Sequence, residues 1–170
     1  IIFKNRDNSQ GASDWDSYSA FLGATKFISL NLTNAASTSV TRFNNTEPTA
    51  TLIHLKNSYH TNYDKMIAYA FHSVDGYSKV GSYTGNSNAD GTFVYTGFKP
   101  AFFMVTASNA TENWLIVDNE RTQSFNPVDG RLIPNSSAAE ETNITPCDFV
   151  SNGVKFRHSD GAWNSSSNTH

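Results

Sequence analysis

The sequence is poor in cysteine, in charge and in long apolar runs. Cys147 is the only cysteine among 170 residues, which excludes an intrachain disulfide and a zinc site built from several thiolates. Charged residues make up only 16% of the chain, the net charge is -3, and there is no run of Lys or Arg. A nucleic-acid groove or an anionic membrane surface needs clustered positive charge, so we expect neither partner. No apolar stretch reaches membrane-spanning length.

Motifs of the common enzymes are also missing. The chain has no Gly-x-Ser-x-Gly, His-Glu-x-x-His, Walker loop or Gly-x-Gly-x-x-Gly, and its five histidines lack metal-ligand spacing. We therefore expect a protein that is not an enzyme, with no cofactor and no catalytic residues. The alternative is a sugar hydrolase, in which carboxylates act beside an aromatic platform. Its candidate residues are Asp14 and Asp16 beside Trp15, and Glu112 near Trp114.

Small polar residues and aromatics are abundant. Asn, Ser and Thr contribute 19, 21 and 17 residues, and aromatics reach 13%. This mixture is typical of short strands joined by polar turns, and it fits a secreted or particle-surface protein. Glycosylation sequons begin at Asn31, Asn44, Asn109, Asn135, Asn143 and Asn164. About four are expected by chance from the composition alone, so we interpret them as composition.

Apolar residues alternate with polar ones in most of the regular segments, as in half-buried strands. The segments are 26–33, 66–71, 92–98, 101–105, 114–118 and 154–158. The segment 66–71 is apolar on both faces, which predicts a central strand. Asp-Gly and Asn-Gly pairs at 75, 90, 129, 152 and 160 predict turns, and a short helical turn is expected only at 16–22. The prediction is an all-β fold, a two-sheet antiparallel sandwich of the jelly-roll or lectin type, in one domain spanning 1–170.

Two parts of the chain, about 1–86 and 101–170, share the same order of elements. Each has an apolar strand, a polar turn with a Trp, a Leu/Asn-to-Ala-Ala element, a polar loop and an amphipathic strand, at an offset of about 100 residues. This indicates two degenerate repeats. In the first, the aromatic segment 66–71 comes next. We expect its counterpart to lie after His170 in a longer chain, or to come from a neighbour, and the edge beside 154–158 to be open. The alternative is a second copy that closes without it.

Three elements resemble a known family. They are LGATK at Leu22–Lys26, GYSKVGSYTGN at Gly76–Asn86 and YTGFKPA at Tyr95–Ala101. The sequence resembles a domain of unknown function that recurs in virion proteins of tailed bacteriophages, often marine ones, and the resemblance covers nearly the whole chain. It implies a structural or adhesive particle protein and carries no catalytic residues that can be transferred.

The segment TGNSNADGTF contains the pattern most similar to a metal site. Asn86, Asn88 and Asp90 stand at alternate positions before Gly91, as at the start of a calcium loop. However, Gly97 occupies the position where a bidentate Glu would close the cage, and only one carboxylate is available. Asn-x-Asn and Asp-Gly also suit a hairpin turn. We therefore predict a turn, and keep calcium as the weaker alternative.

Aromatic residues in polar loops are the remaining candidates for a binding site. Trp15 and Trp114 occupy matching positions in the two repeats, which favours a packing role. Trp163, Tyr59 and Tyr63 lie in loops rich in Asn, Asp and Ser and are expected to be exposed. Exposed aromatics of this kind suit sugar stacking or a protein interface.

The sequence thus leaves two functional hypotheses. The first is a non-enzymatic structural protein on the virion surface, in a tail fibre, spike or capsid decoration, whose partners are copies of itself and other virion proteins. The second is a carbohydrate-binding module that recognises a host-surface glycan.

Overall fold

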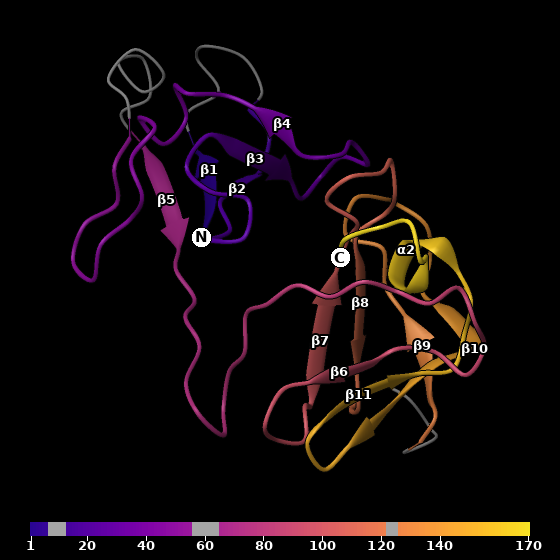
Figure 1. The fold of residues 1–170 in the computed structure, drawn as a ribbon. Coiled ribbons are helices and arrows are strands. Elements are labelled where there is room, and N and C mark those ends of the chain that lie inside the picture. Colours follow the sequence, from indigo (N-terminus) through magenta and orange to yellow (C-terminus); the bar gives the residue numbers. More distant parts are fainter. Residues whose placement is uncertain (7–12, 56–64, 122–125) are drawn as a thin grey trace. The chain divides into compact units, whose positions relative to one another are not determined.

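The protein consists of antiparallel strands arranged in two compact units, Ile1–Phe71 and His72–His170 (Figure 1). The computed structural model describes residues 1–6, 13–55, 65–121 and 126–170. The predicted all-β fold of sandwich type is confirmed. The boundary between the units falls at residue 71, directly after the aromatic segment that ends the first set of elements.

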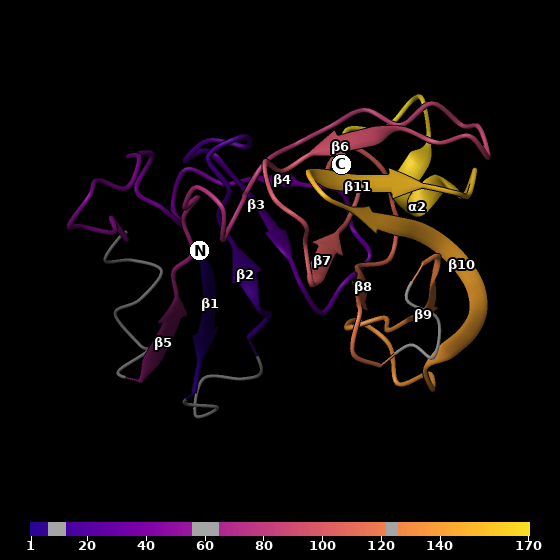
Figure 2. The ribbon, with the colours of Figure 1, turned by 90° about the horizontal axis from the view of Figure 1, so that it is seen from below.

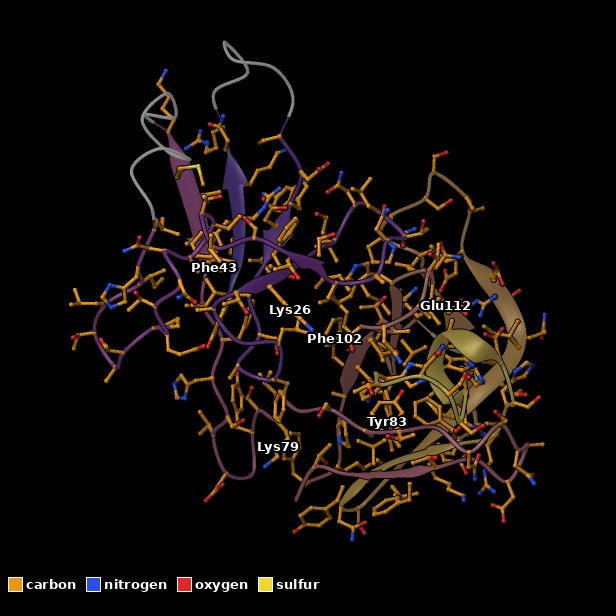
Figure 3. All side chains as sticks on the ribbon, turned by 45° about the horizontal axis from the view of Figure 1, so that its top comes forward. Lys26, Phe43, Lys79, Tyr83, Phe102 and Glu112 are labelled. Atoms are coloured by element: carbon orange, nitrogen blue, oxygen red, sulfur yellow. The ribbon has the colours of Figure 1, made fainter. Side chains whose placement is uncertain are left out.

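The first unit contains one sheet of short strands. Its strands are β1 (Ile2–Asn5), β2 (Asp16–Ser17), β3 (Lys26–Ser29), β4 (Ser37–Thr38) and β5 (Met66–Tyr69), hydrogen-bonded in the order β4-β3-β2-β1-β5. Phe3, Ala24 and Phe43 form its buried core, and the Tyr18 ring meets Phe43 edge-on at 5.4 Å. Figure 3 labels Phe43 among these strands. The alternation of β1 places Phe3 and Asn5 inward, as a period of two requires.

One prediction for the first unit is wrong, and another holds in part. Among the described residues β5 is an edge strand rather than a central one, and Tyr69 is 45% exposed. The expected helical turn at 16–22 is shorter than predicted, because the amides of Leu22 and Gly23 both donate to the Ser19 carbonyl, at 3.0 and 3.1 Å, whereas Asp16 and Ser17 form strand β2. The buried Asp16 carboxylate accepts a hydrogen bond from Ser29 Oγ at 3.0 Å and is paired with Arg42, and these contacts hold the start of the segment in the sheet.

The second unit contains two sheets that enclose its core. Their strands are β6 (Phe93–Tyr95), β7 (Phe102–Val105), β8 (Leu115–Asp118), β9 (Val128–Arg131), β10 (Glu141–Val150) and β11 (Gly153–Phe156), in the orders β6-β11-β10-β9 and β7-β8. Apolar side chains of five of these strands pack together: Val105, Leu115, Val117, Val128, Cys147, Phe149, Val154 and Phe156. Figure 2 shows β10 curving along this unit.

The sequence did not predict β9 or β10. Asp129-Gly130 was expected to form a turn but lies inside β9, where Gly130 pairs with Thr142. β10 is the longest strand and starts with a polar, mostly exposed half. A bulge interrupts its pairing between Thr142 and Cys147. Such an irregular strand carries no period-two signal that local reasoning can detect.

The edge beside β11 is also different from the prediction. β11 pairs with β10 on one side and with β6 on the other, through Val154 opposite Val94. The expectation of an open edge at 154–158 is therefore wrong. The short helix α2 (Gly161–Asn164) comes after β11, and the Asp160 side chain caps it by accepting a hydrogen bond from the Ala162 amide at 2.8 Å.

The two units share a strand-pairing pattern. In the first, Phe27 of β3 lies opposite Ser37 of β4. In the second, Arg131 of β9 lies opposite Glu141 of β10, and both are 104 residues after their counterparts (27 to 131, 37 to 141). An identical register in both ladders is the arrangement that a duplicated module produces.

A side-chain contact is repeated in the same way. Asn31 Oδ1 accepts a hydrogen bond from the Trp15 amide at 2.8 Å, and Asn135 Oδ1 accepts one from the Trp114 amide at 2.8 Å. Each Asn also donates from Nδ2 to the residue before the Trp: 2.9 Å to Asp14 and 2.7 Å to Asn113. The two sequons at these asparagines therefore have a structural role.

Candidate functional site

The loop from Asn86 to Asp90 is built from side-chain-to-backbone turns. Asn86 Oδ1 accepts a hydrogen bond from the Asn88 amide at 3.0 Å, and Asn88 Oδ1 accepts one from the Asp90 amide at 2.9 Å. Asn side chains commonly bond the backbone two residues ahead in this way. The alternate spacing of Asn86, Asn88 and Asp90 therefore belongs to a turn. The predicted hairpin is wrong, however, because β6 pairs with β11, and Tyr83 exchanges backbone hydrogen bonds with His170.

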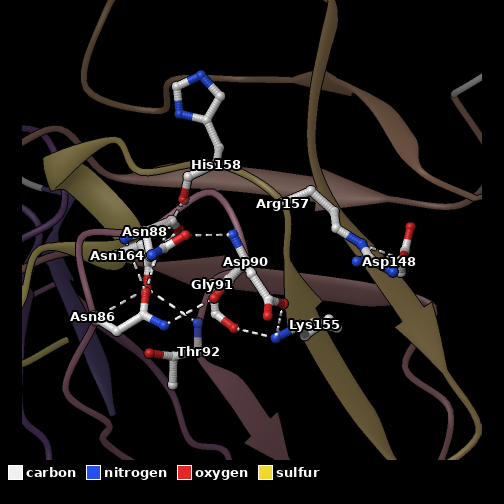
Figure 4. A network of polar contacts seen from close by, with 10 residues as sticks. All are labelled: Asn86, Asn88, Asp90, Gly91, Thr92, Asp148, Lys155, Arg157, His158 and Asn164. Carbon is white, nitrogen blue, oxygen red and sulfur yellow. Dashed lines mark hydrogen bonds and ion pairs between the residues drawn. The ribbon is translucent and has the colours of Figure 1, made fainter.

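The Asn164 side chain anchors this loop from the end of α2 (Figure 4). Asn164 is 0% exposed. Its Oδ1 accepts hydrogen bonds from the amides of Asn86 at 3.1 Å and Thr92 at 3.3 Å. Its Nδ2 lies 2.9 Å from Asn86 Oδ1, 2.8 Å from the Asn88 carbonyl and 3.0 Å from the His158 carbonyl. One buried amide thus satisfies three separate segments of backbone, and it is too deeply buried in this fold to carry a glycan.

Two glycines allow the loop to approach this anchor. A Cβ added at Gly85 would lie 2.2 Å from the carbonyl carbon of Asn164, and one at Gly91 would lie 2.6 Å from Cβ of Phe156. Neither contact is sterically possible without movement of the backbone. The glycines are therefore required by close packing, which the turn signal alone did not indicate.

The single carboxylate of the loop is already engaged by a cation. Lys155 Nζ lies 2.7 Å from Asp90 Oδ1 and also donates to the Gly91 carbonyl. The hydrogen bond with Lys155, and then the charge of Lys155, lower the pKa of Asp90. A calcium ion here would have to compete with this ammonium group. In the described part of the chain, no group of three His, Cys, Asp or Glu side chains is arranged to hold a metal ion.

The expected exposure of Trp163 is wrong. Trp163 is 1% exposed and lies in the core of the second unit. Its ring centre is 6.2 Å from that of Phe156, and the Arg131 guanidinium lies 5.2 Å from it. The Tyr83 hydroxyl donates to the Trp163 carbonyl at 2.7 Å. The polar residues around Trp163 suggested a loop, but the turn of α2 rotates its indole inward.

The other two predicted contact residues, Tyr59 and Tyr63, lie outside the described residues. Trp114 is buried, in line with a packing role, and Trp15 stacks on Tyr69 with a ring separation of 6.4 Å.

The sequence did not single out an exposed aromatic pair on β6. Phe93 is 43% exposed and Tyr95 is 65% exposed, and residues two apart on a strand share one face. Val94 between them packs against the core. A Cβ added at Gly153, opposite Tyr95, would lie 2.7 Å from Cε2 of Phe93, so the Phe93 ring lies over this glycine. The alternation of apolar and polar residues in 92–98 was visible in the sequence, but it does not indicate which face of the strand is buried.

The carboxylates considered for hydrolysis have structural contacts. Burial, and then the negative charge of Asp160, raise the pKa of Glu112, which Figure 3 labels in the second unit. Asp160 itself caps α2 and lies 3.8 Å from Arg131. Asp14 and Asp16 both belong to side-chain hydrogen bonds within the first sheet. These contacts favour a structural role for the carboxylates over a role in hydrolysis.

The fold and the site define an antiparallel all-β protein of sandwich type, with a hydrogen-bonded polar loop and aromatic residues exposed on short strands. No helix in the described residues is long and apolar enough to cross a membrane. The chain belongs to the family described as a domain of unknown function (DUF7483), which it matches over residues 1–170. Neither the curated proteins nor the solved structures contain a match to the chain.

Proposed function

We propose that the chain is a non-enzymatic structural protein of a bacteriophage virion surface, of the tail fibre, spike or capsid-decoration type, which acts by self-assembly and attachment. The observation that carries the self-assembly is the chemistry of its strand edges. β5 and β7 contain no charged residue and no proline, although each lies at the edge of its sheet among the residues that the structure describes. Edge strands of monomeric proteins usually carry such residues to prevent pairing.

Exposed apolar side chains accompany these edges. Phe102 of β7 is 56% exposed, and Figure 3 labels it. Tyr69 of β5 is 45% exposed, and Phe71 just after it is 62% exposed. A surface of this kind suits a protein that lies against copies of itself or against neighbours in a particle. The virion class is supported by the resemblance of Leu22–Lys26, Gly76–Asn86 and Tyr95–Ala101 to phage particle proteins.

Sedimentation velocity over a range of concentrations tests the self-assembly. We expect a mass that increases with concentration and exceeds that of one chain at high micromolar levels. A single monomer peak throughout, together with no association with purified virions of a phage that encodes the chain, contradicts the proposal.

The second candidate function is carbohydrate binding, and the Phe93–Tyr95 pair favours it. Adjacent exposed aromatic rings on one strand face offer a stacking platform for a sugar ring, and polar groups of Lys155 and Asp90 lie beside it. Phe93 and Tyr95 take the place of Trp163 as candidate residues for sugar stacking, because Trp163 is buried.

A glycan array with the purified chain tests this candidate. We expect the double substitution Phe93→Ala, Tyr95→Ala to abolish binding, and Tyr77→Ala, at an 81% exposed tyrosine that does not belong to β6, to leave it unchanged. An empty array, or equal signals from all three proteins, removes the support for carbohydrate recognition.

A further inference from the structure

The register of β6, β11 and β10 determines which side chains share the outer face of this sheet. Lys155 of β11 lies opposite Phe93 of β6 on one side and opposite Asp148 of β10 on the other. Residues directly opposite each other in a ladder point to the same face. Val154, the neighbour of Lys155, belongs to the buried core, so Phe93, Lys155 and Asp148 belong to the outer face.

Two aromatic rings form one end of this outer face. Tyr95 follows Phe93 by two residues on β6, so both rings lie on the same face, and both are exposed. A Cβ added at Gly153 would lie 2.7 Å from Cε2 and 2.8 Å from Cζ of Phe93, and one at Gly97 would lie 3.6 Å from the Tyr95 hydroxyl. Each ring therefore leans over a glycine instead of standing upright on the sheet, and it presents a flat surface to the solvent.

Two ion pairs form the other end of the outer face (Figure 4). Lys155 Nζ lies 2.7 Å from Asp90 Oδ1. The Arg157 amide bonds to the Pro146 carbonyl of β10 at 2.8 Å, so the ladder continues past β11 and Arg157 faces the same way as Lys155. Arg157 Nε donates to Asp148 Oδ2 at 2.6 Å. Asp90 and Arg157 are exposed, and they offer hydrogen-bond acceptors and donors next to the aromatic end.

The two ends together make a strip that runs along β6 and β11 from Tyr95 to Arg157. Tyr95 lies opposite Gly153, and Arg157 follows Gly153 by four residues (157 − 153). Four residues of a strand span about 13 Å, and a pyranose ring is about as wide as the spacing of two residues, roughly 7 Å. The strip therefore has room for two sugar units.

The charges on the strip favour an uncharged ligand. The carboxylates of Asp90 and Asp148 are paired with Lys155 and Arg157, so the four charges cancel. An acidic ligand would have to displace a carboxylate from its cation. The hydroxyl groups of an uncharged ligand can bond to the paired groups without separating them.

We infer that this strip binds an uncharged oligosaccharide of at least two hexose units, which lies along β6 and β11. This inference rests on carbohydrate binding as the second candidate for the proposed function, and it names the ligand class and a second subsite. One sugar stacks its C–H face on the rings of Phe93 and Tyr95, and the next sugar exchanges hydrogen bonds with Asp90 and Arg157.

A glycan array tests the ligand class. It holds uncharged cello-, malto- and galacto-oligosaccharides of increasing length beside sialylated and sulfated glycans. We expect binding of uncharged glycans, stronger for trisaccharides than for single sugars, with an affinity that does not change between low and high salt. Binding of acidic glycans alone, or an affinity that falls with salt, overturns the inference and leaves carbohydrate recognition intact. An empty array refutes both.

Removing the second ion pair tests the second subsite. The double substitution Asp148→Asn, Arg157→Gln keeps the approximate size of both side chains and leaves no buried charge unpaired. By NMR titration, we expect it to weaken binding of the best trisaccharide on the array about tenfold or more, because charged hydrogen bonds to the second sugar are lost. Binding of the corresponding single sugar should be unchanged. Asp90→Asn, at an exposed residue, should cause a selective loss of the same kind.

Arg121→Gln is the matched control, because Arg121 is also paired with carboxylates, those of Asp118 and Glu140, but does not belong to the strip. We expect it to leave both affinities unchanged. Resistance of Cys147 to a thiol reagent and an unchanged near-ultraviolet circular dichroism spectrum verify that the variants are folded. An equal loss for the single sugar and the trisaccharide, or no loss for either, overturns the second subsite and leaves stacking on the aromatic pair intact.

Discussion

Replacing Asn164 by alanine should destabilise the second unit strongly, because one buried side chain connects three segments. The substitution leaves the amides of Asn86 and Thr92 without their acceptor, and the carbonyls of Asn88 and His158 without their donor. A buried polar group left unpaired costs about 1–3 kcal/mol. Water can reach the loop side, where Asn86 and Asn88 are exposed. We therefore expect a loss of about 3 kcal/mol rather than the full sum for four groups.

Urea denaturation measures this loss. The Trp15→Phe background removes the tryptophan of the first unit, so that fluorescence of Trp114 and Trp163 reports on the second unit alone. For a slope of about 2 kcal/mol per molar urea, a loss of about 3 kcal/mol lowers the midpoint by about 1.5 M at an unchanged slope.

Asn88→Ala is the matched control, since it removes the same chemical group from an exposed position. Its Oδ1 accepts one hydrogen bond, from the Asp90 amide at 2.9 Å, and the expected loss is at most about 1 kcal/mol. Asn164→Asp should be at least as harmful as Asn164→Ala, because it places a buried negative charge against the Asn88 and His158 carbonyls. Equal midpoints for Asn164→Ala and Asn88→Ala would refute the anchoring role.

Three further predictions concern other parts of the chain. Cys147 is 0% exposed, and burial raises the pKa of its thiol. A thiol reagent should therefore label Cys147 only as fast as the second unit unfolds. Rapid labelling of the native protein would contradict the position of Cys147 in the core. Gly153→Ala should lower the unfolding midpoint strongly, because the added Cβ would lie 2.2 Å from the Val94 carbonyl oxygen. A midpoint equal to that of the unaltered chain would show that β6 does not approach β11 so closely. Burial and the hydrogen bond to Glu47 raise the pKa of Tyr18 from 10.0 to about 12. Because the pKa of Tyr18 is higher in the folded state, the contribution of its protonated hydroxyl to stability is complete below pH 10 and should be lost between pH 10 and 12. A spectrophotometric titration that compares the unaltered chain with Tyr18→Phe measures this pKa. The absence of a late-titrating tyrosine in the unaltered chain would count against the prediction.

Much of the second unit was predictable from local patterns. The alternation in 92–98, 101–105, 114–118 and 154–158 corresponds to β6, β7, β8 and β11, because a strand exposes successive side chains to opposite faces whatever its partners are. The side-chain turns of Asn86 and Asn88 are local as well, since each bonds the backbone only two residues ahead. The shared order of elements in the two parts of the chain was also visible in the sequence.

The burial of one strand face rather than the other, and the identity of neighbouring strands, were not determined by the sequence. The alternation in 92–98 is compatible with Phe93 and Tyr95 facing inward, yet Val94 between them packs against the core. Trp163 was expected outside because its neighbours are polar, yet the capped turn of α2 directs it inward.

The hydrogen bonds that hold the candidate site together are the clearest example of a feature that depends on the tertiary structure. Asn164 meets Asn86 across 78 residues of chain, and nothing near Asn164 in the sequence distinguishes it from the other asparagines. β9 and β10 likewise depend on a ladder between two segments, in which Thr142 pairs with Gly130 and Cys147 with Val128. Local pattern specifies how a segment can present its side chains, whereas burial and hydrogen-bond partners depend on segments that only folding brings together.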